Sequence, residues 1–333
     1  MVRVIPKVER PVDIREAMDF FRSEDPRTKV PLVDGTTIDY LPAQRLALPV
    51  NKDNAIAAGI VKEEDRDLMV DTVYLNLRRG VLDKSELMVI DLLSNFDWKR
   101  PIHFTQVYIL QNLGLTDYLQ FDGYSYRLVP ILTPYDRRVG EIGRIDPDVI
   151  YPLLMETFRY GNVSDPRVYV DNFIQYNLMA SGAREAFARA AKAFLRRGGA
   201  GDRDKAVALL DAGLEKMPPA QIRYTFSNTF PFLEAYYAAG EMEKGDALLL
   251  SYAENLMQYL DYYLAFEGVQ GDMVSGLIDD KLDELGQIYL LAGYAGRRDA
   301  VARLNDYYRT LGATDEDLLH VDAVSYTHLT LPT

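Results

Sequence analysis

Residues 118–131, YLQFDGYSYRLVPI, carry the clearest short-range signal in the chain. Two runs rich in aromatic and branched residues, 118–121 and 124–131, flank the pair Asp122–Gly123. Asp-Gly between two such runs is typical of a two-residue β-hairpin turn, because both turn positions need positive φ angles. We therefore expect an antiparallel hairpin whose turn is Asp122–Gly123.

The segments before this hairpin predict further strands and two capped helices. Asp13 and Glu16 have the spacing of a capping box, and so do Asp83 and Glu86. The second helix, up to about Phe96, is apolar nearly all round, which predicts a place in the centre of a domain. Alternating or β-branched runs predict strands at 36–41, 46–50, 73–77 and 102–104. Residues 1–145 are therefore predicted to form a mixed α+β domain.

Beyond Pro147 the sequence predicts helices joined by short turns, so residues 146–315 are predicted to be an all-α domain of helical hairpins. The turns at 239–245, AGEMEKG, and 292–300, AGYAGRRDA, resemble the turn of a tetratricopeptide repeat. Small residues at 206, 245 and 300 are expected where two helices cross closely. The spacing is too irregular for a tandem array of ~34-residue units, so the repeats are interpreted as degenerate.

The last residues, 316–333, are predicted to be a tail outside the folded domains. Residues 324–333, VSYTHLTLPT, look like the translation of a transposon-end adapter used in sequencing libraries. We expect the natural sequence to depart from this one near Ala323, and we exclude the segment from the prediction of the fold.

Composition excludes several classes of function. The 333 residues carry a formal net charge of −13, which disfavours nucleic acid as a partner. There is no cysteine and there are only three histidines, so neither a thiolate site nor a His-rich metal centre is available. No run approaches the ~18 apolar residues of a membrane span, and MVRVIPKVER lacks a signal-peptide core. We expect no metal and no cofactor.

A few polar and aromatic residues near the hairpin are candidates for binding or chemistry. His103 is a potential general base or anion contact beside Arg100, although a lone histidine next to a core is more often held in place by a hydrogen bond. Tyr124, Tyr126 and Arg127 lie on the hairpin itself. A hydrolase site would require Arg100, His103, Tyr124 and Arg127 to converge in one cleft with a carboxylate.

Tyrosine is abundant, with 23 residues, and offers a second kind of candidate site. Tyr236, Tyr259 and Tyr263 belong to local tyrosine clusters in the helical part. Exposed tyrosines can stack on sugars or peptides, whereas packing between helices explains most tyrosines in such positions. These three tyrosines are the candidate binding residues of the helical part.

Several phrases together resemble one bacterial family of large multi-pass membrane proteins related to protein O-mannosyltransferases, itself of otherwise unknown function. The resemblance covers roughly residues 10–315. Its phrases are REAMDFF (15–21) with SEDPRTK (23–29), DYLP (39–42), LPVNK (48–52), KSELM (84–88), DWKRPIHF (97–104), YRLVP (126–130) and YGN (160–162) with Asp165–Pro166. These phrases contain residue pairs that favour turns, and they do not form the motif of a binding or catalytic site.

The resemblance implies that this chain is the soluble C-terminal region of such a glycosyltransferase-like protein, on the periplasmic face of the inner membrane. Members are expected to use a lipid-linked sugar donor, with the catalytic acid in loops between upstream membrane helices. No catalytic residue can therefore be placed in this chain. The expected function is a non-catalytic accessory region that holds an acceptor polypeptide or a partner subunit on a concave helical face and contacts the upstream membrane domain. The alternative is a free-standing tetratricopeptide-like adaptor.

Overall fold

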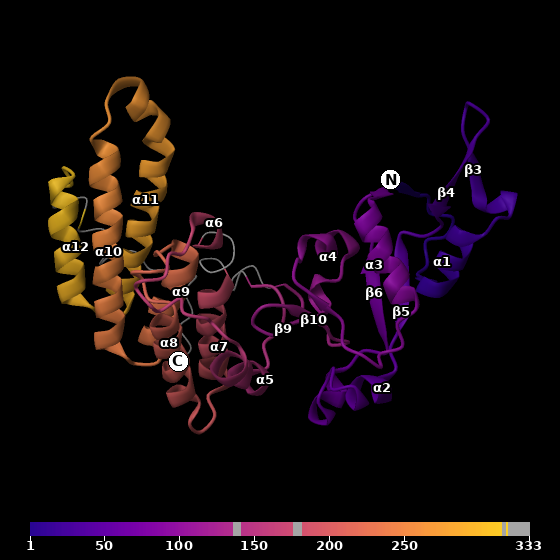
Figure 1. The fold of residues 1–333 in the computed structure, drawn as a ribbon, viewed down its shortest axis with the longest axis horizontal. Coiled ribbons are helices and arrows are strands. Elements are labelled where there is room, and N and C mark those ends of the chain that lie inside the picture. The colour runs from indigo at the N-terminus through magenta and orange to yellow at the C-terminus, as the bar shows by residue number, and fades with distance from the viewer. Residues whose placement is uncertain (136–140, 176–181, 315–317, 319–333) are drawn as a thin grey trace. The chain divides into compact units, whose positions relative to one another are not determined.

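The computed structural model describes residues 1–135, 141–175, 182–314 and 318, and it divides the chain into two compact units, Met1–Asp146 and Pro147–Thr333. The first unit mixes short strands with short helices, and the second is built from helices (Figure 1). The predicted fold class, an α+β region followed by an all-α region, is confirmed. The predicted tail at 316–333, with its adapter-like residues 324–333, lies outside the described residues except for residue 318.

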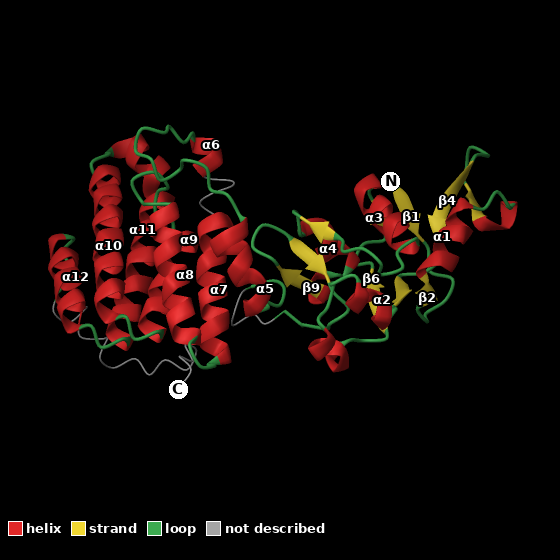
Figure 2. Ribbon diagram, turned by 60° about the horizontal axis from the view of Figure 1, so that its bottom comes forward, coloured by secondary structure: helices red, strands yellow, loops and turns green. Residues whose placement is uncertain are grey.

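Three small sheets form the framework of the first unit (Figure 2). Their strand orders are β3-β4-β1-β7, β2-β5-β6 and β8-β10-β9. The strands are β1 (Val2–Val4), β2 (Val12–Asp13), β3 (Lys29–Pro31), β4 (Thr37–Leu41), β5 (Arg45–Pro49), β6 (Thr72–Asn76), β7 (Val81–Leu82), β8 (His103–Phe104), β9 (Leu119–Phe121) and β10 (Tyr126–Leu128). The helical elements are α1 (Ile14–Arg22), η1 (Pro26–Thr28), α2 (Lys52–Ala57), η2 (Glu63–Leu68), α3 (Lys84–Ser94), α4 (Tyr108–Leu113) and η3 (Thr116–Tyr118).

Both predicted helix starts in this unit are found, but the capping box expected at Asp13 and Glu16 is not formed, because the Asp13 side chain accepts the Arg15 N–H instead. The Asp83 side chain accepts the Glu86 N–H and the Glu86 side chain accepts the Asp83 N–H, so the capping box of α3 is complete. The expectation that α3 is buried on all sides is wrong, because Met88 and Leu92 are exposed. The apolar face formed by Ile90 and Leu93 meets the core, and the opposite apolar residues face solvent.

The hairpin is antiparallel as expected, but its turn is longer than predicted. Phe121 pairs with Tyr126, so the loop contains four residues, 122–125, and the Asp122 N–H donates to the Ser125 carbonyl at 2.9 Å. The Asp122 side chain is buried in contact with Arg127 instead of occupying the corner of a tight turn. Burial of a carboxylate is costly unless the charge is paired, and Arg127 supplies that partner.

The only tryptophan is a core residue of the first unit. Trp98 is almost fully buried, and its indole N–H donates to the Pro49 carbonyl at 2.8 Å. Its ring packs on Phe96, and its φ of 63° places the backbone in the left-handed region. The phrase DWKRPIHF thus has a structural role at its Trp98, where a strained backbone angle is held by burial and a hydrogen bond.

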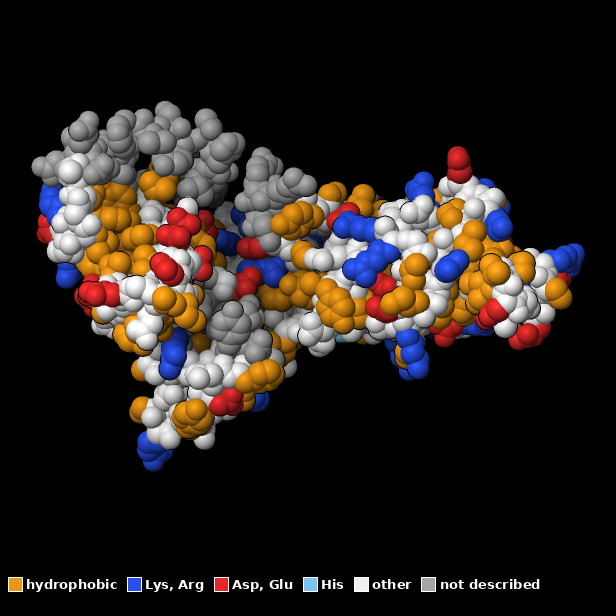
Figure 3. All heavy atoms as spheres, turned by 90° about the horizontal axis from the view of Figure 1, so that it is seen from above, with side chains coloured by type: hydrophobic (Ala, Val, Ile, Leu, Met, Phe, Trp, Pro, Cys, Tyr) orange, Lys and Arg blue, Asp and Glu red, His pale blue; other side chains and the backbone are white. Residues whose placement is uncertain are grey.

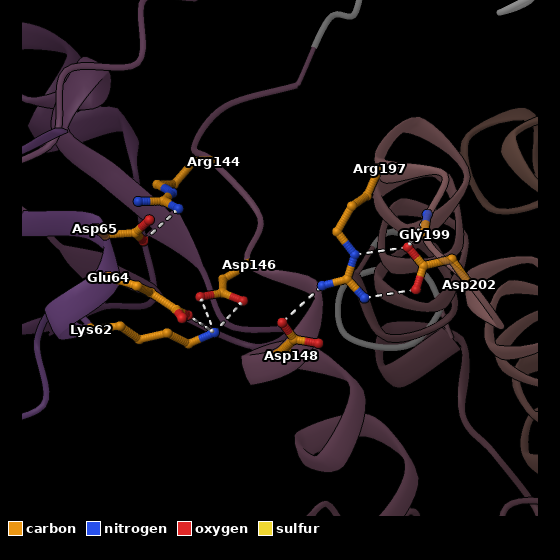
Figure 4. A network of polar contacts seen from close by, with 9 residues as sticks. All are labelled: Lys62, Glu64, Asp65, Arg144, Asp146, Asp148, Arg197, Gly199 and Asp202. Atoms are coloured by element: carbon orange, nitrogen blue, oxygen red, sulfur yellow. Dashed lines mark hydrogen bonds and ion pairs between the residues drawn. The ribbon is translucent and has the colours of Figure 1, made fainter. Parts of the chain in front are cut away.

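Salt bridges fix the last segment of the first unit, as Figure 4 shows. Lys62 lies 2.9 Å from Asp146, and Arg144 lies 2.9 Å from Asp65. Main-chain hydrogen bonds join Arg144 to both Leu119 and Phe121 on β9. The chain before Asp146 is therefore attached to the same sheet that carries the hairpin.

In the described part of the second unit, six long helices form three successive hairpins, α7–α8, α9–α10 and α11–α12. The α7 helix packs on α8 and α9, and α10 packs on α9, α11 and α12. The elements are α5 (Pro147–Pro152), the π-helical segment η4 (Leu153–Thr157), α6 (Asn172–Ile174), α7 (Arg184–Arg197), α8 (Asp202–Lys216), α9 (Phe226–Ala238), α10 (Met242–Leu264), α11 (Gly268–Tyr294) and α12 (Arg298–Thr310). Their likeness to tetratricopeptide repeats stays a prediction.

Two of the predicted hairpin turns contain a glycine in the left-handed region of backbone conformation. Gly240 and Gly296 have φ angles of 76° and 68°, which residues other than glycine rarely adopt. In the α7–α8 turn, Asp202 accepts two hydrogen bonds from Arg197, at 2.8 and 2.7 Å, and one from the Gly199 N–H (Figure 4). The Arg197 hydrogen bonds lower the pKa of Asp202 to about 2.

The close contact between helices that was expected at position 245 is confirmed. A Cβ at Gly245 would lie 2.4 Å from the ring of Tyr237, and that ring is fixed because its hydroxyl donates to Asp246 at 3.0 Å. We expect Gly245→Ala to destabilise the helical unit by about 1–3 kcal/mol despite the higher helix propensity of alanine.

The matched control for Gly245→Ala is Gly276→Ala, because the space around Gly276 in α11 is empty. That change should stabilise the unit by up to about 1 kcal/mol through helix propensity alone. Urea unfolding followed by circular dichroism at 222 nm measures both. Equal midpoints for the two variants would contradict a tight α9–α10 contact.

Candidate functional site

A cluster of polar side chains lies on the β8-β10-β9 sheet. The register places Arg127 opposite His103 on one side and Gln120 on the other, so these three side chains project from the same face. Asp122, directly after β9, completes the group. We define this set of His103, Gln120, Asp122 and Arg127 as the hairpin cluster.

Asp122 and Arg127 form a buried ion pair at the centre of the hairpin cluster. The Arg127 Nε lies 3.0 Å from the Asp122 Oδ2, and the Gln120 amide donates to the Asp122 Oδ1 at 3.1 Å. Arg127 also donates to the Gly59 carbonyl at 2.8 Å. Burial raises the pKa of Asp122, while the Arg127 charge opposes that shift. The Asp122 carboxylate is thus a buried charge that is compensated by the Arg127 guanidinium.

His103 is the accessible member of the hairpin cluster. Its Nδ1 lies 3.0 Å from the Ser125 hydroxyl and 4.0 Å from the Asp122 carboxylate. Partial burial lowers the pKa of His103, and Asp122 opposes that effect, so the ring is mainly neutral at pH 7. A Ser-His-Asp relay needs the serine and the carboxylate on opposite ring nitrogens. Here both approach the same nitrogen, so the cluster lacks that geometry.

The remaining residues predicted near the hairpin are more dispersed. Arg100 is exposed in the loop before β8, and Tyr124 is exposed in the hairpin loop. Tyr126 is half-buried, with its ring 5.1 Å from that of Phe121. The structure therefore brings together His103 and Arg127 of the predicted set. It adds Gln120, which is paired with Arg127 across the strands, and Asp122 and Ser125 of the hairpin loop, which contact Arg127 and His103.

The three predicted tyrosines of the helical unit have different environments. Tyr236 is buried, and its hydroxyl donates to Asp211 at 2.9 Å, so it belongs to the packing between helices. Tyr259 and Tyr263 are half-buried and stack on each other along α10, with ring centroids 6.0 Å apart. Lys281 of α11 lies over the Tyr259 ring, which braces the two helices.

A groove of about 360 Å³ lies between α10 and α12. Its lining combines apolar side chains with acidic and basic ones; the residues are Leu250, Ala253, Glu254, Met257, Arg303, Leu304, Asp306, Tyr307 and Thr310. The Tyr307 hydroxyl contacts Asp261 at 3.3 Å at one end of this groove. A shallow groove with this mixed lining suits a polypeptide segment better than a small ligand.

Nearly all of the first unit matches a known protein family. Residues 3–149 match the family model of TMEM260-associated domain 2. No curated protein and no solved structure matches the chain. TMEM260 is a suspected protein O-mannosyltransferase-like membrane protein, so the TMEM260-associated domain agrees in outline with the family resemblance of the sequence. The bacterial origin remains a prediction.

Two further observations limit what the described residues contain. Across 1–135, 141–175 and 182–314, no group of three or more His, Asp or Glu side chains is placed to hold a metal ion. No helix in these same segments is both long and apolar enough to span a bilayer.

Proposed function

We propose that this chain is a non-catalytic accessory region of a membrane glycosyltransferase-like protein, located on its periplasmic side. The observation that carries the proposal is the match of residues 3–149 with a domain defined by its association with TMEM260. The α+β unit is then the part that accompanies the membrane domain. The helical unit holds a polypeptide, either an acceptor or a partner subunit.

The helical unit supports the polypeptide-binding part of this proposal. Its described residues form three helical hairpins, and an open groove between α10 and α12 is lined by apolar and charged side chains. Stacked helical hairpins offer extended surfaces that suit polypeptides. The formal charge of residues 147–333, with 27 acidic and 17 basic residues, is −10 of the total of −13, so this unit attracts basic rather than acidic partners.

The first test is to sequence the intact gene across both ends of this stretch. We expect an upstream reading frame with several apolar spans of about 20 residues, and a different sequence after Ala323. Initiation signals directly before Met1, with 324–333 truly encoded, would overturn the proposal. That result would favour the free-standing adaptor.

A second test uses the intact membrane protein. Deleting residues 147–333 should raise the KM for a polypeptide acceptor and leave hydrolysis of the lipid-linked sugar donor unchanged, because the chemistry lies upstream. Loss of donor hydrolysis in the deletion variant would contradict a non-catalytic role for the helical unit.

A further inference from the structure

The ends of α10 and α11 form an uncovered two-helix arm, residues 261–284. The buried residues of α10 end at Leu260, and those of α11 begin only at Leu285. Helices of this length usually gain most of their stability by burying one face against other elements. Here more than half of α11 has no buried residue, which leaves a surface available for a partner.

Large apolar side chains are exposed on this arm. Met273 and Val269 are 79% and 76% exposed, Tyr262 is 61%, and Leu264 and Leu277 are 49% and 44%. Val269, Met273 and Leu277 follow each other at four-residue intervals, so they form one stripe along α11. Single exposed apolar residues are ordinary, but a group of five on adjoining helix ends is typical of an interaction site.

The surface is braced before any partner arrives. The Tyr262 ring lies 5.6 Å from that of Tyr263 and 5.2 Å from that of Phe266, and Tyr263 stacks on Tyr259. Lys281 of α11 lies over the Tyr259 ring of α10, and Glu284 of α11 accepts hydrogen bonds from Lys281 at 2.6 Å and from the Tyr252 hydroxyl of α10. Rigid aromatic residues lower the ordering cost of binding, and a flexible methionine such as Met273 adapts to different side chains.

The charge of the arm selects the chemistry of the partner. Residues 261–284 contain seven acidic residues and one basic residue, Lys281. Figure 3 looks onto the helical unit from the end with the α10–α11 turn and shows apolar side chains gathered beside acidic ones. Such a surface repels the anionic headgroups of a membrane and attracts Lys and Arg.

We infer that the α10–α11 arm is a docking surface for a polypeptide segment that carries both apolar and basic side chains. Its apolar residues would cover the Val269–Met273–Leu277 stripe, and its Lys or Arg residues would pair with the surrounding carboxylates, including Asp272 and Asp280. This inference rests on the proposed polypeptide-binding function and gives it, beside the α10–α12 groove, a second surface with a stated partner chemistry.

The test measures binding of a fluorescent peptide of about 14 Leu and Lys residues to the full 333-residue chain. The variant Val269→Ser/Met273→Ser/Leu277→Ser should weaken binding about tenfold or more, because it removes the apolar contact area. The control Met88→Ser/Leu92→Ser, exposed on α3, should bind as the parent chain does. Raising NaCl from about 50 mM to about 500 mM should weaken peptide binding by both the parent chain and the control.

Several outcomes would overturn the inference. They are equal binding by the triple variant and the control, equal binding of a Leu-Glu peptide, or preferential binding to vesicles containing anionic lipid. A change in the monomer–dimer equilibrium of the triple variant, seen by sedimentation with peptide binding unchanged, would assign the arm to self-association. A large loss of stability in the triple variant would make the stripe structural. The proposed function is tested separately, by the sequence of the intact gene. A failure of the proposed function can therefore be distinguished from a failure of this inference.

Discussion

Replacing Arg184 with methionine is expected to destabilise the helical unit by about 3–5 kcal/mol, although methionine fills a similar volume. Arg184 begins α7 and has no exposed surface. Its guanidinium donates to the carbonyls of Met217 and Ile222, the latter at 2.7 Å, and to the Asn228 side chain at 3.3 Å. Burial lowers its pKa to about 10, so the group remains charged at neutral pH.

The loss of stability is expected because the substitution leaves buried hydrogen-bond acceptors without a donor. A buried ion pair can be replaced by apolar residues at little cost, because both partners are removed together. Two of the acceptors here are main-chain carbonyls of the connection between α8 and α9, and no side-chain substitution removes them. Each unsatisfied buried carbonyl costs about 1–3 kcal/mol. Arg184→Lys, which cannot span all three acceptors, should fall between the parent chain and Arg184→Met.

The chain offers separate probes and a matched control for this measurement. Its only tryptophan, Trp98, is buried in the α+β unit, so its fluorescence reports that unit, whereas circular dichroism at 222 nm is dominated by the long helices. Arg184→Met should shift the dichroism transition in urea and leave the fluorescence transition in place. Arg196→Met, an exposed change on the same helix, should shift neither by more than about 0.5 kcal/mol. Equal shifts for both variants would refute the role of Arg184.

Elements with strong local signals could be predicted from the sequence. The capping box at Asp83 and Glu86, the hairpin between 118 and 131, and the glycine turns at 240 and 296 depend on neighbouring residues, and all are present. The close contact at Gly245 could also be predicted, because a small residue within an otherwise bulky helix face indicates a crossing.

Features that depend on distant contacts could not be predicted. Arg184 resembles any charged residue at a helix start, and only the fold places the carbonyls of Met217 and Ile222 around it. Asp122 matches a tight-turn residue in sequence, but in the structure it lies in a four-residue loop with its side chain buried against Arg127. The difference arises because the favourable energy comes from tertiary burial and charge pairing, which no local pattern contains.

Replacing Arg127 with methionine should destabilise the α+β unit by about 3–5 kcal/mol near neutral pH, because it leaves the buried Asp122 carboxylate without its cation. The pKa of Asp122 is already raised by burial, and Arg127 is the largest effect that opposes the shift. Without Arg127 that pKa rises further. A carboxyl group whose pKa is higher in the folded than in the unfolded state holds its proton more tightly when folded, so stability falls as pH rises above the unfolded pKa of about 4.

The cost of Arg127→Met should therefore be larger at about pH 7.5 than at about pH 5, where protonation of Asp122 relieves the buried charge. Urea unfolding followed by Trp98 fluorescence at both pH values measures this difference. The double variant Arg127→Met/Asp122→Asn should recover part of the loss and show little pH dependence, because the charge itself is gone. His103, 4.0 Å from Asp122, also gains a proton on acidification, so each pair is repeated with His103→Gln.

A pH-independent loss in Arg127→Met would have a different meaning. Arg127 also donates to the Gly59 carbonyl at 2.8 Å, and its buried side chain projects from the central strand β10. A loss of equal size at both pH values would assign its role to that hydrogen bond and to packing. A loss that grows with pH, and whose pH dependence disappears in the double variant, would show that the hairpin cluster is organised around the Asp122 charge. In that case His103 is held beside a buried carboxylate that the fold keeps neutralised by Arg127, which accounts for a histidine at this position without any catalytic role.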